Sequence, residues 1–118
     1  MEIIEPRTLK TTVHLCLMNE NKRDPETFKS PCRELIAQSL IYYDNFDGFI
    51  YNLRTELSKF RQTCFDNRRD IIGKSYIRID FSTQAGEKIV GYCDIGVGVS
   101  VNLTLRFLET ENVLYTDN

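Results

Sequence analysis

The stretch from residue 95 to residue 107, IGVGVSVNLTLRF, alternates without a break between apolar residues at odd positions and small or polar residues at even positions. This alternation is typical of a β-strand with one buried face. Thirteen extended residues would span about 43 Å, which is much longer than an ordinary strand, so we expect a bend or turn at Gly96 or Gly98. The pattern predicts sheet structure in the C-terminal part of the chain.

Three other segments favour strands. Residues 11–18 and 77–82 alternate between apolar and polar side chains, and 88–94 follows residues 84–87, which fit a hairpin turn. The first of these strands carries His14, the single histidine, on its polar phase. We interpret this histidine as a surface residue rather than a general base.

Two helices are predicted between the first strand and the others. Ser30-Pro31 is a helix start signal, and Asp24-Pro25 offers the same signal earlier in the chain. The apolar residues of the first helix are Leu35, Ile36, Leu40 and Tyr43. The second helix is capped by Asp47, and its apolar stripe is formed by Phe49, Ile50, Leu53, Leu57, Phe60 and Cys64.

The predicted element order is β-α-α-β-β-β, which is α+β: one antiparallel sheet backed by a two-helix hairpin. We expect a single domain over residues 1–118, because one core is the norm at this length. Residues 1–10 and 112–118 are expected to be flexible ends.

Composition and charge narrow the functional classes. The chain is 42% apolar and 27% charged, as in ordinary globular domains. Its net charge of −2, from 15 basic and 17 acidic residues, gives no electrostatic basis for binding nucleic acid or an anionic membrane. No apolar run approaches the length of a membrane span, and the N-terminus has neither the basic start nor the apolar region of a signal peptide. We therefore expect a cytoplasmic protein.

No residue pattern indicates catalysis. The four cysteines, Cys16, Cys32, Cys64 and Cys93, have long, irregular spacings and no C-x-x-C pair, so reduced thiols are expected rather than a metal site or disulfides. No serine or cysteine has an evident base beside it in the sequence. Gly96-Val97-Gly98 lacks the third glycine and the following helix of a dinucleotide loop. We predict a protein without enzymatic activity, cofactor or metal.

The two predicted helices resemble those of the small dynein light chains of the eight-kilodalton class. The family pattern E-x-x-x-Q-x-L-x-x-Y-N, followed by I-A-x-x-I-K-x-E-F-D-K, is matched within residues 34–44 and 49–59. The identical positions are Glu34, Gln38, Leu40, Tyr43, Glu56 and Lys59. The segment 71-IIGK-74 is similar to the family's I-V-G-R, and the resemblance covers about residues 24–107.

The resemblance implies a homodimeric light chain of a dynein motor, acting on microtubules in the cytoplasm, the cytoskeleton or the axoneme of a cilium. It implies that extended segments of dynein intermediate chains or other partners add as strands at the dimer interface. The peptide-binding and dimer strand would consist of Ile77, Arg78, Ile79, Asp80, Phe81, Ser82 and Thr83. The groove would end at Phe46 and Asp47, where the family has an acidic-basic pair, so an altered ligand pocket is expected.

Two alternatives remain open. One is a small adaptor or inhibitor, a viral protein among the candidates, that binds a protein partner through a helix face or the flat sheet. The other is an RNA-binding module, since residues 74–81, KSYIRIDF, partly match the strand K/R-G-F/Y-G/A-F-V-x-F/Y. Arg78 replaces the central stacking aromatic of that motif, and the predicted element order differs from the RNA-binding fold, so nucleic acid is the less favoured partner.

Overall fold

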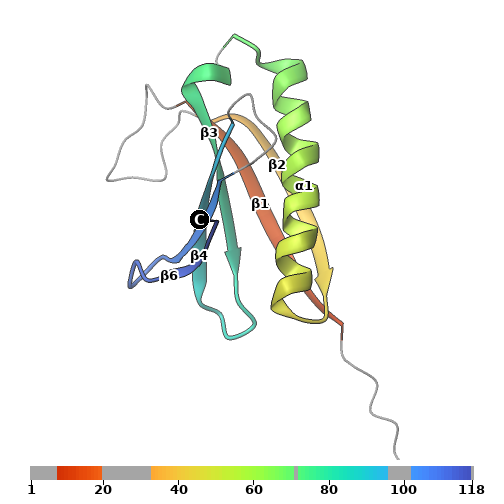
Figure 1. Cartoon of the computed structure of the whole chain (residues 1–118), viewed down its shortest axis with the longest axis vertical. Helices are drawn as coiled ribbons and strands as arrows, with labels where there is room; N and C mark the ends of the chain where they lie inside the picture. Colours follow the sequence, from red (N-terminus) through yellow and green to blue (C-terminus); the bar gives the residue numbers. More distant parts are fainter. Residues whose placement is uncertain (1–7, 20–32, 71, 96–101, 118) are drawn as a thin grey trace, which may run out of the picture.

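The computed structural model describes residues 8–19, 33–70, 72–95 and 102–117. Its elements are β1 (Leu9–Asn19), β2 (Arg33–Tyr43), α1 (Phe46–Asn67), a short 3-10 turn η2 (Ile72–Lys74), β3 (Ser75–Ser82), β4 (Lys88–Asp94), β5 (Leu103–Phe107) and β6 (Val113–Thr116). The fold is α+β, with one six-stranded antiparallel sheet and one helix on one of its faces (Figure 1).

The order of the strands across the sheet is β2-β1-β3-β4-β5-β6. Strand β1 pairs with β2 along nearly its whole length but with β3 only from His14 to Asn19. The sheet therefore divides at one end, where the β1–β2 hairpin and the β3–β4 hairpin run apart (Figure 1). The predicted strands at 11–18, 77–82 and 88–94 are confirmed, and the turn between the last two contains Gly86 at a φ of 86°.

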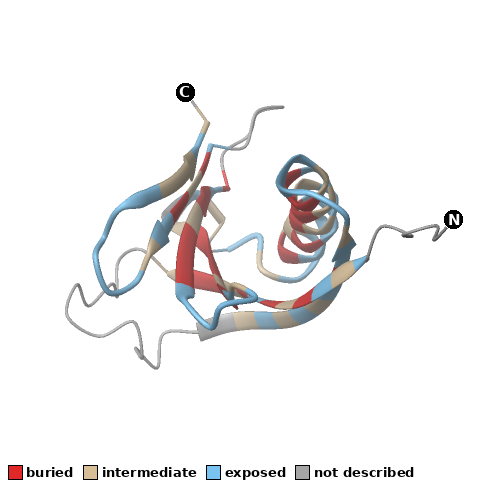
Figure 2. Ribbon diagram, turned by 90° about the horizontal axis from the view of Figure 1, so that it is seen from below, coloured by how far each residue is buried: buried red, intermediate tan, exposed pale blue. Residues whose placement is uncertain are grey.

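The predicted second helix is confirmed as α1, and its apolar stripe faces the sheet. Phe49, Ile50, Leu53, Leu57, Phe60 and Cys64 are all buried. Figure 2 shows this buried side turned toward the buried face of the sheet. The helix begins at Phe46 rather than after Asp47, because the side chain of Asn45 accepts the backbone N–H of Gly48 at 2.8 Å and is the N-cap.

The predicted first helix is wrong, because residues 33–43 form strand β2. The run IAQSLIYY contains an aromatic pair after a β-branched residue, which favours an extended backbone. Pairing with β1 then satisfies main-chain groups along the segment and buries Ile41. The start signals Asp24-Pro25 and Ser30-Pro31 lie outside the described residues.

The ends of the chain are more ordered than expected. Leu9 and Lys10 belong to β1, and residues 113–116 form β6 in the sheet. The expectation of flexible ends is therefore wrong for these residues, and residues 1–7 lie outside the described part. The predicted long strand 95–107 is reduced to β5: Ile95 is buried outside a strand, and Gly96 and Gly98 are not among the described residues.

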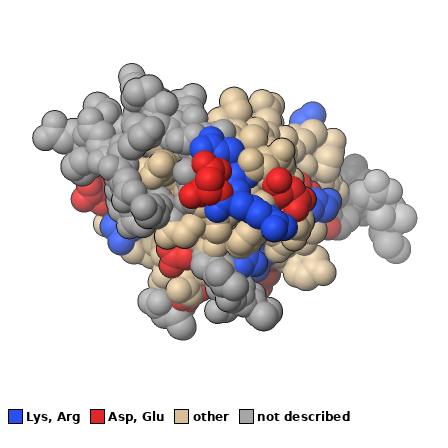
Figure 3. Space-filling view, turned by 90° about the horizontal axis from the view of Figure 1, so that it is seen from above, with Lys and Arg blue, Asp and Glu red and all other residues tan. Residues whose placement is uncertain are grey.

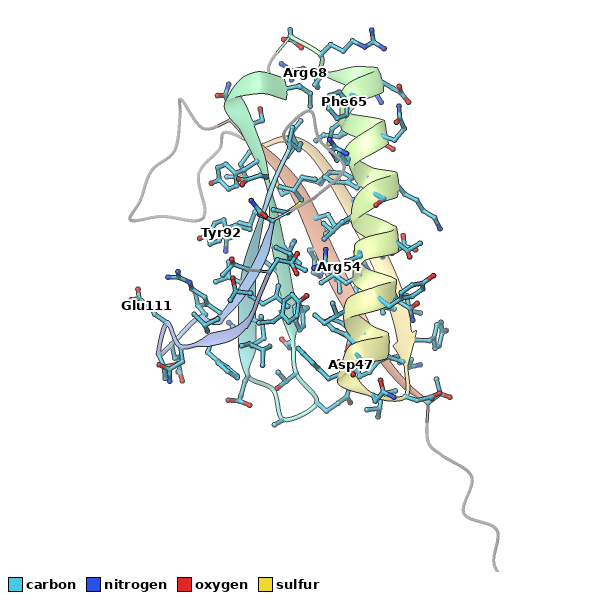
Figure 4. The ribbon with its side chains drawn as sticks, in the orientation of Figure 1. Asp47, Arg54, Phe65, Arg68, Tyr92 and Glu111 are labelled. Carbon is cyan, nitrogen blue, oxygen red and sulfur yellow. The ribbon has the colours of Figure 1, made fainter. Side chains whose placement is uncertain are left out.

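A polar cluster joins α1 to the C-terminal end of the chain. Arg54 points from the helix toward the sheet (Figure 4), donates to the Tyr115 hydroxyl at 2.9 Å and forms an ion pair with Asp117. Burial raises the pKa of Asp117, but hydrogen bonds from Arg54 and Tyr115 outweigh this effect and hold the pKa below its usual value. The stability that this carboxylate adds is thus present above a pH of about 4 and is lost as the pH falls through its lowered pKa.

Candidate functional site: the free edge of strand β2

Strand β2 is the outermost strand at one side of the sheet, and no described strand pairs with its other side. Its even-numbered side chains lie on the outer face, which we define as the face turned away from α1. Three of them are large, apolar and exposed: Ile36 (67%), Leu40 (49%) and Tyr42 (56%). Gln38, between the first two, is also exposed. A long edge strand with such a row is a site where another chain can pair.

The hydrogen bonds around β2 show which main-chain groups are directed outward. Lys10 and Tyr42 are opposite each other, yet the Lys10 carbonyl accepts from Gln84 at 3.2 Å and the Tyr42 carbonyl from Asn52 at 2.7 Å. This geometry identifies the two residues as a non-hydrogen-bonded pair of the antiparallel ladder. Because hydrogen-bonded and non-hydrogen-bonded pairs alternate, the N–H and C=O groups of Ile36, Gln38 and Leu40 are directed away from β1.

The hydrogen bonds of the β3–β4 hairpin show independently that the main-chain groups of Gln38 are directed away from β1. The N–H of Thr83 donates to the carbonyl of Glu87 at 2.8 Å, so odd-numbered residues of β3 bond to β4 and even-numbered ones to β1. Asp80 therefore bonds to His14, and His14 directs its main-chain groups toward β3 rather than toward Gln38. The two derivations agree that Gln38 has outward-directed groups.

One flank of α1 lies beside this edge. Asn52 binds the Tyr42 carbonyl, and the hydroxyl of Ser39 donates to Oε2 of Glu56 at 3.2 Å. Lys59, one turn further along, lies 3.4 Å from Oε1 of Glu56. The edge is therefore bordered on the inner side by a carboxylate and an ammonium group, while its outer side is the apolar row. We call the main-chain groups of Ile36, Gln38 and Leu40, together with that row, the β2 edge.

The strand expected to bind peptides is not an edge strand. Residues 77–80 pair with β1 on one side and β4 on the other, because the sheet places β3 at its centre. Ile77, Ile79 and Phe81 are in the core, and Arg78, 9% exposed, makes two hydrogen bonds to Asp80 at 2.8 and 2.9 Å. For Ile77, Arg78, Ile79 and Asp80, the prediction of a free edge is wrong.

Phe81, Ser82 and Thr83 lie where the sheet divides. They line one side of a pocket of about 390 Å³, and residues Lys10, Thr11, Thr12 and His14 of β1 line the other. The side chain of Gln84 reaches across, donating to the Lys10 carbonyl and to the hydroxyl of Tyr43, both at 3.2 Å. This part of the predicted strand thus borders a small polar opening rather than a long ladder.

The predicted groove end, Phe46 and Asp47, lies at the start of α1, close to the end of β2. Phe46 is 43% exposed, with its ring 6.4 Å from that of Phe49 and 6.2 Å from that of Tyr115. Asp47 is exposed in the first turn of α1 (Figure 4). Both residues follow β2 directly in the chain, so they adjoin the end of the edge at Tyr42.

Two cysteines are buried in the core and poorly suited to nucleophilic chemistry. Burial raises the pKa of Cys64 to about 11 and that of Cys93 to about 12. Among the described residues, no group of three or more histidine, cysteine or acidic side chains is placed to hold a metal ion. Cys16, on β1, is only partly buried. These thiols are best explained as small core side chains.

Alkylation should separate the cysteines by burial. With iodoacetamide at a pH of about 8, Cys16 should be modified before Cys64 and Cys93, which remain unmodified in the folded protein, because the thiolate is the reactive species. At that pH a thiol with a pKa of about 12 is ionised in about one molecule in ten thousand. Peptide mass spectrometry at successive times measures the rates, and a denatured sample is the control. Rapid modification of Cys93 in the folded protein would contradict its burial.

Charges of opposite sign are mixed at the end of the molecule where α1 finishes. Figure 3 shows basic and acidic side chains next to one another on this face, and Arg68 pairs with Asp70 at 3.1 Å. Among the described residues on this face, acidic side chains flank the basic ones and weaken any attraction to a phosphate backbone. The described residues also contain no helix that is long and apolar enough to cross a membrane.

Comparison with models of protein families, with curated proteins and with solved structures finds no match for this chain. The structure itself defines the class: an α+β domain with a helix on one face of an antiparallel sheet, in which no described strand pairs with the outer side of the long edge strand β2. The β2 edge is the site that the sequence did not predict, because residues 33–43 were expected to be helical. The aromatic and β-branched run at its C-terminal end is the signal that points to a strand.

Proposed function

We propose that the protein is a non-enzymatic protein-binding module that takes up an extended segment of another chain as an added strand along the β2 edge. The observation that carries this proposal is the set of outward-directed main-chain groups at Ile36, Gln38 and Leu40, beside an exposed apolar row. In strand addition the main-chain hydrogen bonds supply affinity, and alternate side chains supply selectivity. The bound segment would place apolar residues beside Ile36 and Leu40.

This proposal keeps strand addition, the mode of binding that the sequence suggested, but assigns it to a different strand. Strand addition at residues 77–83 is replaced by strand addition at β2, because β3 is central in the sheet. A role in a dynein motor is a narrower form of the proposal, and it rests on a helical hairpin whose first helix is a strand here. The adaptor or inhibitor is the broader form, and the exposed row on the outer face favours it equally.

A single proline tests the site. Gln38→Pro removes an N–H that is directed away from β1, so the β1–β2 ladder stays intact, as is usual for proline in edge strands. Peptides selected from a displayed random library on the wild-type protein serve as the probe, with binding measured by fluorescence anisotropy. We expect at least a tenfold loss of affinity (about 1.4 kcal/mol) in Gln38→Pro.

Two matched variants serve as controls. Gln38→Ala keeps the N–H and should retain most of the affinity. Ala37→Pro removes an N–H that bonds to β1 and leaves the opposing carbonyl without its partner, so it should instead lower the stability of the sheet, by about 1–3 kcal/mol. Unchanged peptide binding in a folded Gln38→Pro protein would place the site elsewhere and refute the proposal.

A further inference from the structure

We infer that the extended segment that occupies the β2 edge is β2 of a second copy of this chain, running antiparallel about a twofold axis at Gln38. This inference rests on the proposed function, since it names the partner of the same site. It also implies regulation: any other extended segment would have to displace the second copy before it could bind.

The main-chain groups allow such pairing without rearrangement. With Gln38 opposite Gln38 of the copy, Ile36 is opposite Leu40 of the copy, and Leu40 is opposite Ile36. All of these residues direct both their N–H and their C=O groups outward. Every one of these opposing pairs would therefore be a hydrogen-bonded pair of an antiparallel ladder, and the sheet would continue across the two chains.

The side chains select this register over its neighbours. A shift in either direction that keeps the outward-directed groups opposite each other would place Gln38 against Ile36 or against Leu40. Only the register centred on Gln38 sets the amide against its own copy and the aliphatic side chains against one another. Ile36 and Leu40 are 67% and 49% exposed in the single chain, so both have surface to cover. Apolar cross-strand pairs and paired amides both stabilise a sheet.

The charges beside the edge are also self-complementary. From Leu35 to Tyr43 the strand has no charged residue, so no like charges meet across the seam. The Ser39–Glu56 hydrogen bond places Glu56 next to the centre of the proposed axis. The axis sets the two α1 helices antiparallel on the same face of the sheet, so the neighbouring Glu56 and Lys59 of one chain face the same two residues of the other. Lys59 is 69% exposed and lies 3.4 Å from Oε1 of its own Glu56, so each carboxylate near the axis has an ammonium group beside it.

A second copy is the occupant best suited to this edge. An edge strand of this length with exposed apolar residues tends to pair with other chains and cause aggregation unless another segment covers it. A twofold interface closes after two chains, because the same surface is used on both sides. The copy is also present whenever the protein is.

Disulfide trapping tests the register directly. In Gln38→Cys, the two introduced thiols would lie on opposing residues about 5.5 Å apart at Cα, which suits a disulfide. In the matched variant Leu40→Cys they would be about 13 Å apart along the strands and would not join. Mild oxidation followed by peptide mass spectrometry should give the 38–38 link at least tenfold faster than any 40–40 link. Wild-type protein under the same oxidation controls for the natural cysteines.

Light scattering and sedimentation at micromolar concentrations provide the second measurement. We expect a dimer for the wild type and at least a tenfold weaker dimer for Gln38→Pro. Glu56→Lys should also weaken the dimer, and adding Lys59→Glu should restore it, because opposite charges then face each other again. Because the exchange also restores the Glu56–Lys59 ion pair within each chain, the free energy of unfolding is measured on the same variants. A dimer that weakens and recovers while unfolding stays unchanged supports a contact across the interface, and parallel changes in unfolding contradict it.

The outcomes separate this inference from the proposed function. A monomer at all concentrations, or equal trapping rates at positions 38 and 40, overturns the second copy as occupant. If the monomeric wild-type protein binds the selected peptides and the Gln38→Pro variant does not, the proposed function stands without the dimer. If neither the copy nor peptides bind at β2, both are wrong.

Discussion

Leu53→Ala should lower the free energy of unfolding by about 2–5 kcal/mol. Leu53 is fully buried at the centre of the stripe by which α1 contacts the sheet. Removing its isobutyl group withdraws buried apolar surface and leaves a cavity between rigid neighbours, and both effects destabilise the folded state. Urea denaturation followed by circular dichroism measures the loss.

Leu40→Ala is the matched control, because it makes the same chemical change on the other side of the sheet. Leu40 is 49% exposed on the outer face, so its loss should change stability by only about 0.5–1 kcal/mol. It should instead weaken strand addition at the β2 edge. Equal destabilisation by the two substitutions would mean that the core is not centred on this face of α1.

Gly91→Ala should destabilise the protein by about 1–3 kcal/mol, although alanine is intrinsically better than glycine in a strand by about 0.5–1 kcal/mol. A Cβ at this position would lie 2.5 Å from Cδ2 of Leu105, 3.1 Å from the carbonyl oxygen of Thr104 and 3.3 Å from Cβ of Ile79. Leu105 is itself fully buried and has little room to move, so overpacking outweighs the gain in propensity.

Two further variants test this explanation. Gly73→Ala is the control, because a Cβ there would meet nothing within 4 Å, and its stability should stay within about 0.5 kcal/mol of wild type. Leu105→Val shortens the side chain that would clash with the new Cβ. The double variant Gly91→Ala/Leu105→Val should therefore lose less unfolding free energy than the sum of the losses in the two single variants. Strict additivity in thermal or urea unfolding would rule out the proposed clash.

Under the proposed function, selectivity at the β2 edge would come from shape and polarity rather than from charge. In the proposed strand addition, the main-chain groups would pair with any extended segment, and the outward row of side chains would select among segments. Ile36 and Leu40 favour aliphatic partners, while Gln38 between them favours an amide or hydroxyl. A charged residue opposite this row would lose hydration without gaining a partner, which discriminates against charged segments.

The pattern of the sequence was sufficient for α1, β1, β3 and β4, because each has a periodicity that only one structure satisfies. The stripe from Phe49 to Cys64 has a helical period over about four turns, and the alternation around Leu15 and Ile79 has a period of two. These are also the elements with the most buried residues, so local preference and tertiary burial agree.

Residues 33–43 show where local pattern is not sufficient. Leu35, Ile36, Leu40 and Tyr43 fit a helical stripe, and in the structure Ile36 and Leu40 lie on the opposite face of a strand from Leu35 and Tyr43. What decides the matter is the presence of β1, whose backbone is available for pairing from Leu9 onward. Pairing between distant segments is a property of the whole chain, so the local pattern of residues 33–43 alone does not reveal it.

The sequence by itself thus determined the α+β class, the helix that closes the core and the central strands, because hydrophobic periodicity encodes which face of an element is buried. It also gave the idea of strand addition. Only the tertiary structure decided which strand has a free edge, because that depends on the order of strands in the sheet. The order buries β3 between two neighbours and leaves Ile36, Gln38 and Leu40 of β2 with main-chain groups directed outward.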